Sequence, residues 1–279
     1  MRKKALLGTI FLAGALISIL IIVIPGIPPS IENLTYYEEY GSFSVLQNTS
    51  FENNSIFYPE DLGRDGMKHP LVIWGDGTTA YPYIYGGLLR HLASHGFIVI
   101  GPNDPRTRSG DTMIAAMNLI ITQNDNSSSP FYQKIDITKI CVMGHSQGAS
   151  TTLLLGELDC VTCTIPIMPS WLLYWFHHGN QIISQKCPML LIAGTNDTIC
   201  APETNSDVIF GKSNVPTFYG KLIDGVHLDA IGDAGVMRKY ITAWCYTHLF
   251  ENATSRAVFY GSEASIYSDS GWIWDSTNV

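Results

Sequence analysis

The sequence predicts an α/β fold, in which a mostly parallel central sheet has helices on both faces. Short apolar runs that end near glycine alternate with segments that carry apolar residues at helical spacing. Strands buried on both faces are apolar throughout, which is the pattern of a parallel sheet. Polar stretches follow four of the runs directly, namely WGDGT (74–78), GHSQG (144–148), GTNDT (194–198) and GVHLD (225–229). In such sheets, sites form at the carboxyl ends of strands.

The elements follow in order along one domain. The expected strands are 43–48, 55–59, 69–75, 96–103, 137–144, 161–167, 188–194 and 217–224. The expected helices are 83–96, 109–124, 147–158 and 230–250. Gly96 is a helix stop signal, and Ser109 and Asp111 are capping residues at a helix start. We expect a catalytic domain over residues 31–252, whereas residues 253–279 form a C-terminal extension to which the sequence assigns no role.

The N-terminus is typical of an export signal. Three basic residues precede Ala5 to Ile24, about 20 uncharged and mostly apolar residues, which is enough to span a bilayer. Residues 1–30 are therefore a signal peptide or a membrane anchor with a Pro-rich linker. We favour the anchor, because no small-x-small cleavage site follows. Either reading places the rest of the chain outside the cytoplasm, secreted or on the outer face of the membrane. Sequons at Asn33, Asn48, Asn53, Asn126, Asn196 and Asn252 agree with that location.

Composition excludes some partners and cofactors. Charged residues make up 14% of the chain and the formal net charge is −8, which argues against nucleic acid and anionic membrane surfaces. Six cysteines are compatible with disulfides, whose pairing the sequence does not give. Cys160 and Cys163 have no second metal-spaced pair, so we expect no metal site, and Cys141 is expected to be a buried free thiol. The oligomeric state stays open.

Gly144-His145-Ser146-Gln147-Gly148 suggests a nucleophile elbow. G-x-S-x-G marks a sharp turn between a strand and a helix that exposes a strained serine, and the glycines let the two backbones pass closely. This pentapeptide follows an expected strand and opens an expected helix. The alternative is a chance match in a chain rich in Gly and Ser. We interpret Ser146 as a catalytic nucleophile.

A serine hydroxyl needs a base, which a carboxylate orients, and in α/β hydrolases the chain order is Ser, Asp or Glu, His. Asp197 follows a buried strand and is the candidate acid; its alternative is an Asx-turn, and Asp224 is the second choice. His227, between a strand and the last helix, is the candidate base; its alternative is a surface loop histidine. His145 is expected to shape the elbow.

The oxyanion hole needs two backbone N–H donors. The residue after the nucleophile, Gln147, supplies one. The other comes from the loop after the strand 69–75, where we choose Thr78 and then Gly77. A plain Gly-Asp turn is the alternative.

The chain resembles the cutinase-like polyester hydrolases and the related dienelactone-hydrolase-like α/β hydrolases. LRHLASHGFIVIGPND, SSSPFYQKIDITKICVMGHSQGAS and GTNDTICAP carry the resemblance, which covers nearly all of residues 40–250. It implies an α/β-hydrolase fold and substrate-binding roles for Trp171, Ile199 and Leu228. The family typically has an aromatic residue at the position of Thr78 and methionine at that of Gln147. Trp171 and its neighbours in WLLYWF could instead be core or a surface hydrophobic patch.

The sequence thus predicts a serine carboxylic-ester hydrolase that uses a Ser-His-Asp triad, an acyl-enzyme and no cofactor. Its substrates would be small or polymeric esters with hydrophobic acyl groups, including polyesters such as poly(ethylene terephthalate). Lipid-ester hydrolysis or acyl transfer by the same triad is an alternative. A non-catalytic binding module outside the cytoplasm is another, and it would leave the serine unreactive.

Overall fold

A nine-stranded sheet forms the centre of the part of the chain that the structure describes. The structure is a computed structural model and describes residues 34–178 and 184–279. The strands are β1 (Val45–Phe51), β2 (Asn54–Pro59), β3 (His69–Gly75), β4 (Ile98–Pro102), β5 (Ile135–His145), β6 (Cys163–Ile167), β7 (Met189–Gly194), β8 (Thr217–Leu222) and β9 (Trp272–Thr277). Their order is β1-β2-β4-β3-β5-β6-β7-β8-β9. The five pairings from β4 through β8 are parallel, and the three outer pairings are antiparallel.

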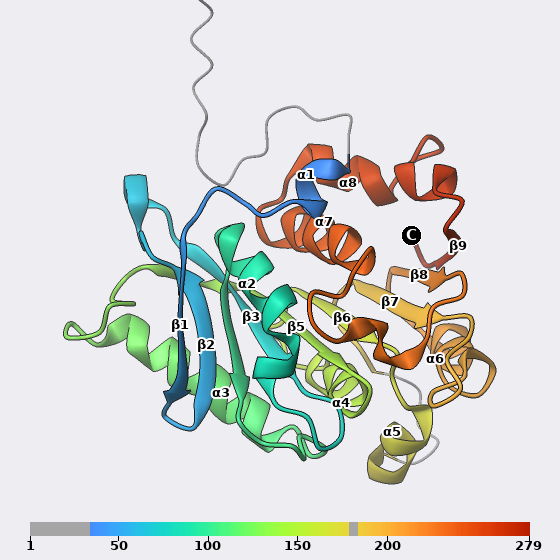
Figure 1. Cartoon of the computed structure of the whole chain (residues 1–279), viewed down its shortest axis with the longest axis horizontal. Helices are drawn as coiled ribbons and strands as arrows, with labels where there is room; N and C mark the ends of the chain where they lie inside the picture. The colour runs from blue at the N-terminus through green and yellow to red at the C-terminus, as the bar shows by residue number, and fades with distance from the viewer. Residues whose placement is uncertain (1–33, 179–183) are drawn as a thin grey trace, which may run out of the picture.

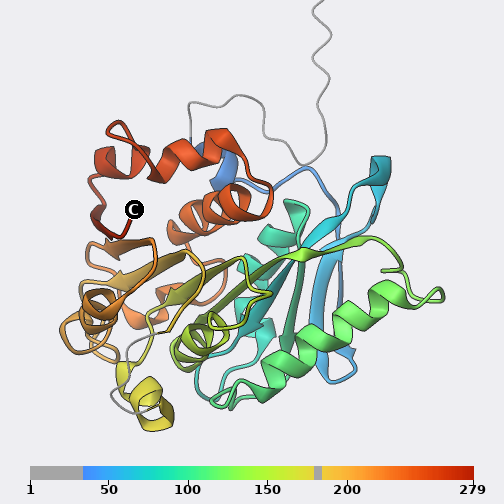
Figure 2. The same ribbon diagram turned by 180° about the vertical axis from the view of Figure 1, so that it is seen from behind.

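Helices cover both faces of this sheet. They are α1 (Thr35–Glu38), α2 (Gly86–Ser94), α3 (Asp111–Asp125), α4 (Gln147–Leu155), α5 (Trp171–His178), α6 (Ser206–Lys212), α7 (Met237–Leu249) and α8 (Ala253–Phe259). Helices α2 and α7 lie in front of the sheet in Figure 1, and α3 and α4 lie in front of it in Figure 2. The fold is therefore the α/β-hydrolase type that the sequence predicts.

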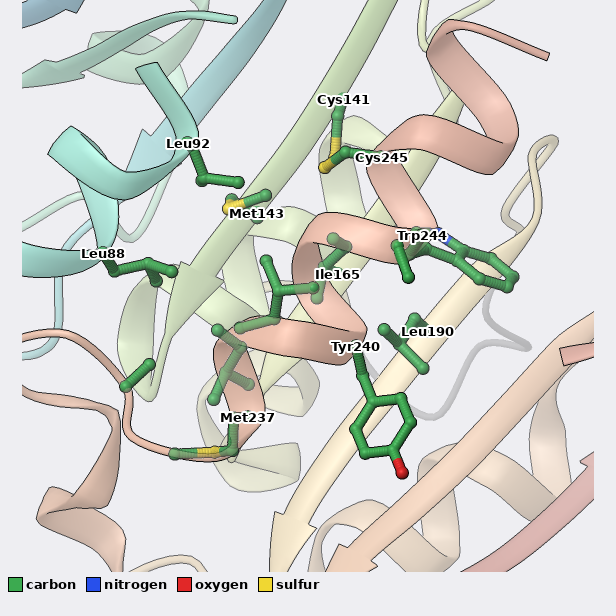
Figure 3. Close-up of a cluster of buried hydrophobic side chains, with 14 of the residues drawn as sticks. Leu88, Leu92, Cys141, Met143, Ile165, Leu190, Met237, Tyr240, Trp244 and Cys245 are labelled. Carbon is green, nitrogen blue, oxygen red and sulfur yellow. The ribbon is translucent and has the colours of Figure 1, made fainter. Parts of the chain in front are cut away.

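The core follows the alternation of side chains along the strands. On β3, Val72 and Trp74 belong to the cluster beneath α2 and α7, whereas Leu71 and Ile73 belong to the cluster beneath α3. Figure 3 shows the first cluster, in which Met143, Ile165 and Leu190 of the strands face Tyr240 and Trp244 of α7. Such fully buried strands have no polar face, which is why their apolar runs could be recognised in the sequence.

Helix α7 begins at Met237, seven residues after the expected start at Ala230. The intervening loop has positive φ angles at Gly232 (75°), Ala234 (59°) and Gly235 (47°). A right-handed helix cannot include these conformations. The Gly232 carbonyl instead accepts a hydrogen bond from the amide of Leu88 at 2.9 Å, which ties this loop to α2.

Residues 253–279 add α8 and β9 to the fold. Strand β9 pairs with β8 along its full length. Trp272 and Trp274 stack with ring centroids 5.2 Å apart, and a Cβ on Gly220 of β8 would lie only 2.6 Å from the Trp274 ring. The C-terminal extension thus supplies an edge strand, a role that the sequence did not reveal.

Two expectations about the compartment find no support in the structure. All six cysteines are free, so no disulfide is present, and Cys141 is a buried thiol as predicted. The predicted signal or anchor lies outside the described residues. Within residues 34–178 and 184–279, no helix has the length and apolar character needed to cross a membrane.

Candidate active site

Ser146 occupies a strained turn between β5 and α4. Its φ and ψ are 55° and −113°, a conformation that non-glycine residues rarely adopt. The turn is tight because β3 and α4 touch: a Cβ on Gly148 would lie 2.1 Å from the carbonyl oxygen of Gly75, and one on Gly144 would lie 2.7 Å from that oxygen. The amide of Ser146 donates to the Ile167 carbonyl at 3.0 Å, which fixes the turn against β6.

The three residues predicted as a triad meet at the carboxyl edge of the sheet. Ser146 Oγ lies 3.0 Å from Nε2 of His227, and Nδ1 of His227 lies 2.7 Å from Oδ2 of Asp197. Asp197 follows β7 and His227 follows β8, so three separate loops bring the groups together. All three residues are buried or nearly so, with Ser146 exposed to 9%. Burial removes competing water from both hydrogen bonds.

Asp197 is held as an anion that orients the imidazole. Its Oδ1 accepts hydrogen bonds from the amides of Ile199 (2.9 Å) and Cys200 (2.8 Å). Burial raises the pKa of this carboxyl, but the hydrogen bonds from His227 and from the two amides outweigh burial and leave the pKa below its ordinary value. A carboxylate on Nδ1 keeps the proton on that nitrogen and leaves Nε2 free to accept one from Ser146.

The loop after β3 lies beside the serine. A Cβ on Gly77 would be 3.6 Å from Cβ of Ser146, and Nε2 of Gln147 donates to Oγ1 of Thr78 at 2.7 Å. Gln147 begins α4, and the first-turn N–H groups of a helix have no intrahelical partner. The backbone amide of Gly77, in contrast, already has a hydrogen-bond partner, because it donates to Oη of Tyr85 at 3.2 Å.

The three residues predicted to bind substrate differ in exposure. Ile199 is 66% and Leu228 59% exposed, and they stand on the loops that carry Asp197 and His227. Trp171 begins α5 and is only half-buried, since its ring stacks on Tyr174 with centroids 5.3 Å apart. Ile199 and Leu228 therefore offer exposed apolar surface on the two loops, whereas part of the Trp171 ring is covered by its packing on Tyr174.

Sequence reasoning missed several residues at this site. Cys200 is buried beside Ser146, and its pKa is raised to about 12, chiefly by burial, so the thiol stays protonated. Asp76 is buried in the loop that follows β3, and Tyr85 hydrogen-bonds both Gly77 and His145. None of these three residues carried a sequence signal for a role in the site, whereas their neighbour His145, inside the serine motif, was expected to shape the elbow. Among the described residues, no cluster of three or more His, Cys, Asp or Glu could hold a metal ion.

Comparison with known proteins identifies the family. A family model described as "PETase: PET hydrolase-like" matches residues 28–268. Cutinase 1 of Thermobifida cellulosilytica is 27% identical over 219 residues, which cover 73% of this chain and 79% of the relative. The cutinase of Thermobifida fusca strain YX is also 27% identical, over 73% of this chain and 68% of its own. The bis(hydroxyethyl) terephthalate hydrolase of Streptomyces coelicolor is 27% identical over 73% of this chain and 64% of its own. Because the family model spans most of the chain, the protein belongs to the PET hydrolase-like family.

Proposed function

We propose that this protein is a serine carboxylic-ester hydrolase in which Ser146 is the nucleophile, His227 the base and Asp197 the residue that orients the base. The observation that carries the proposal is the unbroken chain from Ser146 Oγ through the imidazole to the carboxylate, at 3.0 and 2.7 Å. Relatives named as cutinases and as a bis(hydroxyethyl) terephthalate hydrolase support ester substrates.

The reaction has two stages, acylation and then deacylation of Ser146. Ser146 Oγ attacks the ester carbonyl while Nε2 of His227 takes its proton, and a tetrahedral oxyanion forms. Collapse of this intermediate breaks the ester C–O bond, and the imidazolium returns the proton to the departing alcohol. Water then gives a proton to His227 and attacks the acyl-enzyme. The second collapse releases the acid and restores the serine.

The oxyanion is stabilised by the backbone N–H groups of Gln147 and Thr78. Thr78 is preferred to Gly77 because the Gly77 amide already donates to Tyr85. The bond from the Gln147 side chain to Thr78 Oγ1 holds the two donors together. Preorganised donors of this kind each contribute roughly 3–4 kcal/mol to the barrier reduction in serine hydrolases.

The substrate is an ester with a hydrophobic acyl group, and the wider substrate range includes polyesters such as poly(ethylene terephthalate). Exposed Ile199 and Leu228, on the loops that carry Asp197 and His227, support this assignment, because they offer apolar contacts to a long or bulky acyl chain. Membrane anchoring by residues 5–24, with the enzyme on the outer face, completes the proposal and rests on the N-terminal sequence.

The first test is hydrolysis of a chain-length series of p-nitrophenyl esters by the wild type and by Ser146→Ala. Loss of turnover in Ser146→Ala, with loss of labelling by a fluorophosphonate, supports the proposal. Bis(hydroxyethyl) terephthalate and polyester film are assayed beside the series to test the polyester range. Added alcohol tests the acyltransferase alternative, since a new ester would then replace the free acid. A folded wild type that neither turns over nor reacts with the fluorophosphonate contradicts the proposal and favours a binding module.

A further inference from the structure

A chain of buried hydrogen bonds joins the loop after β3 that holds Gly77 and Thr78, here called the oxyanion loop, to the loop that carries His227. The amide of Gly77 donates to Oη of Tyr85 at 3.2 Å. Oη of Tyr85 lies 2.9 Å from Nδ1 of His145, and Nε2 of His145 lies 2.9 Å from the backbone carbonyl oxygen of His227. Tyr85 and His145 are 1% and 3% exposed. Both side chains are therefore shielded from solvent, and the hydrogen-bond chain reaches His227 through its backbone carbonyl.

The direction of each hydrogen bond in this chain is determined. A carbonyl oxygen only accepts, so Nε2 of His145 must carry a proton and donate it to His227. A neutral imidazole has one N–H, so Nδ1 of His145 is an acceptor. Tyr85 then donates its only proton to Nδ1, and its oxygen accepts from the Gly77 amide. Every donor in the chain has an acceptor, and the order is Gly77, Tyr85, His145, His227.

His145 must remain neutral for this order to hold. Burial and the nearby His227 lower the pKa of His145 to about 3, against the opposing effects of the His227 carbonyl and Asp197. The two imidazole centroids are 4.6 Å apart. A second cation at that distance would oppose the positive charge that His227 acquires during the reaction.

The chain also accounts for glycine at position 77. A Cβ there would lie 2.9 Å from Oη of Tyr85 and 3.2 Å from Nδ1 of His145. Gly77 thus packs directly against the two atoms of the Tyr85–His145 hydrogen bond, and any side chain there would push the oxyanion loop away from them.

We propose that Tyr85 and His145 are positioning residues, which set the oxyanion loop and the catalytic histidine at a fixed distance from each other. This inference rests on the proposed function. The two loops are far apart in the amino-acid sequence, and both must be correctly placed in the same transition state. A displacement of about 1 Å between such groups lowers rates about a hundredfold.

The test compares Tyr85→Phe, His145→Phe and His145→Gln in the full-length protein with p-nitrophenyl butyrate. Rates are normalised to the serine labelled by a fluorophosphonate. We expect Tyr85→Phe and His145→Phe each to lower kcat about 10- to 100-fold, with KM changed less than about twofold. The double variant should lose no more than the worse single variant, because the chain is broken once. His145→Gln should recover part of the loss, since its amide N–H can still donate to the His227 carbonyl.

His91→Gln is the matched control. His91 is a buried histidine whose Nε2 also meets a backbone carbonyl, that of Tyr37 at 3.0 Å, but it lies on α2 away from the serine. It should keep kcat within about twofold of the wild type even if stability falls. Nitrogen NMR of the wild type gives a readout independent of activity, with a protonated Nε2 and an unprotonated Nδ1 expected for His145.

Three outcomes would overturn the inference: a wild-type kcat in Tyr85→Phe, additive losses in the double variant, or the opposite tautomer of His145. A wild type that the fluorophosphonate does not label defeats the proposed function itself, and the inference with it. Normal labelling and turnover with an unaffected Tyr85→Phe defeats the inference alone.

Discussion

As pH rises from 5 to 7, the wild type should lose stability relative to a variant in which Asp76 is replaced by asparagine. Asp76 is 1% exposed; its Oδ1 accepts from Nε1 of Trp74 at 2.7 Å, while Oδ2 has no hydrogen-bond partner among the described residues. Burial is the largest cause that raises the pKa of Asp76, to about 8. The Trp74 hydrogen bond opposes this shift, and the charge of Asp104 adds to it.

The sign and size of the effect follow from proton linkage. The ordinary pKa of the carboxyl is 3.8, so between about pH 4 and pH 8 the folded protein binds a proton that the unfolded chain lacks. The stability that this proton contributes is fully present below the ordinary pKa of 3.8 and is lost as pH rises through the folded-state pKa of about 8. Each pH unit inside the window lowers the free energy of unfolding by about 1.4 kcal/mol, which amounts to about 2.7 kcal/mol between pH 5 and pH 7.

The assay is urea unfolding of the wild type and Asp76→Asn at pH 5, 6 and 7, followed by tryptophan fluorescence. Asparagine keeps an oxygen for Trp74 and does not titrate, and all other groups are common to both proteins. The difference in unfolding free energy should therefore move in favour of the variant by about 1.4 kcal/mol per pH unit. A difference that stays constant from pH 5 to 7 would refute the reasoning. The carboxylic-acid stretch in an infrared difference spectrum provides a second check.

Three further outcomes are expected. Asp197→Asn should lower kcat roughly 10³- to 10⁴-fold, because the amide no longer selects the right tautomer of His227. Steady-state ester hydrolysis checks this, with KM expected to stay unchanged. A loss in kcat of less than tenfold would argue against the triad. Gly148→Ala should abolish activity and lower the midpoint of thermal unfolding, because its Cβ would meet the Gly75 carbonyl oxygen at 2.1 Å; a fully active variant would show that the elbow can relax. Trp272→Ala should lower the free energy of unfolding by about 3 kcal/mol and leave kcat unchanged, as measured by urea unfolding and ester hydrolysis. Unchanged stability would mean that β9 does not hold the sheet edge.

Sequence predicted best those elements whose local pattern and buried position agree. The strand 69–75 has the same bounds in the structure, because its apolar residues are all buried and a Gly-containing loop follows. Strand β9 escaped notice because WIWDST is short and pairs with β8, about fifty residues earlier. The start of α7 was placed too early because nothing local distinguishes Ala234, with its positive φ, from a helical alanine.

The same contrast between local sequence patterns and distant partners applies to the residues of the site. Ser146, Asp197 and His227 could be selected because each follows a strand in a known chain order, and parallel strands bring their carboxyl ends to one edge. Tyr85 could not, because its partners are Gly77 on the preceding loop and His145 sixty residues away. Tyr85 also belongs to a segment with apolar residues at helical spacing, and such a pattern predicts packing in the core and not a polar contact of the hydroxyl. Buried polar contacts of this kind depend on tertiary geometry, which spacing does not encode.

The position of α1 has a consequence for how an anchored enzyme would meet its substrate. Helix α1 packs against α7 and lies at the opposite end of the molecule from α5, as Figures 1 and 2 both show. The nine residues from Pro25 to Asn33 can span at most about 30 Å. A chain held in a bilayer by residues 5–24 would therefore be tethered through the side of the molecule where α1 packs on α7, whereas Ser146, Asp197 and His227 meet at the carboxyl edge of the sheet.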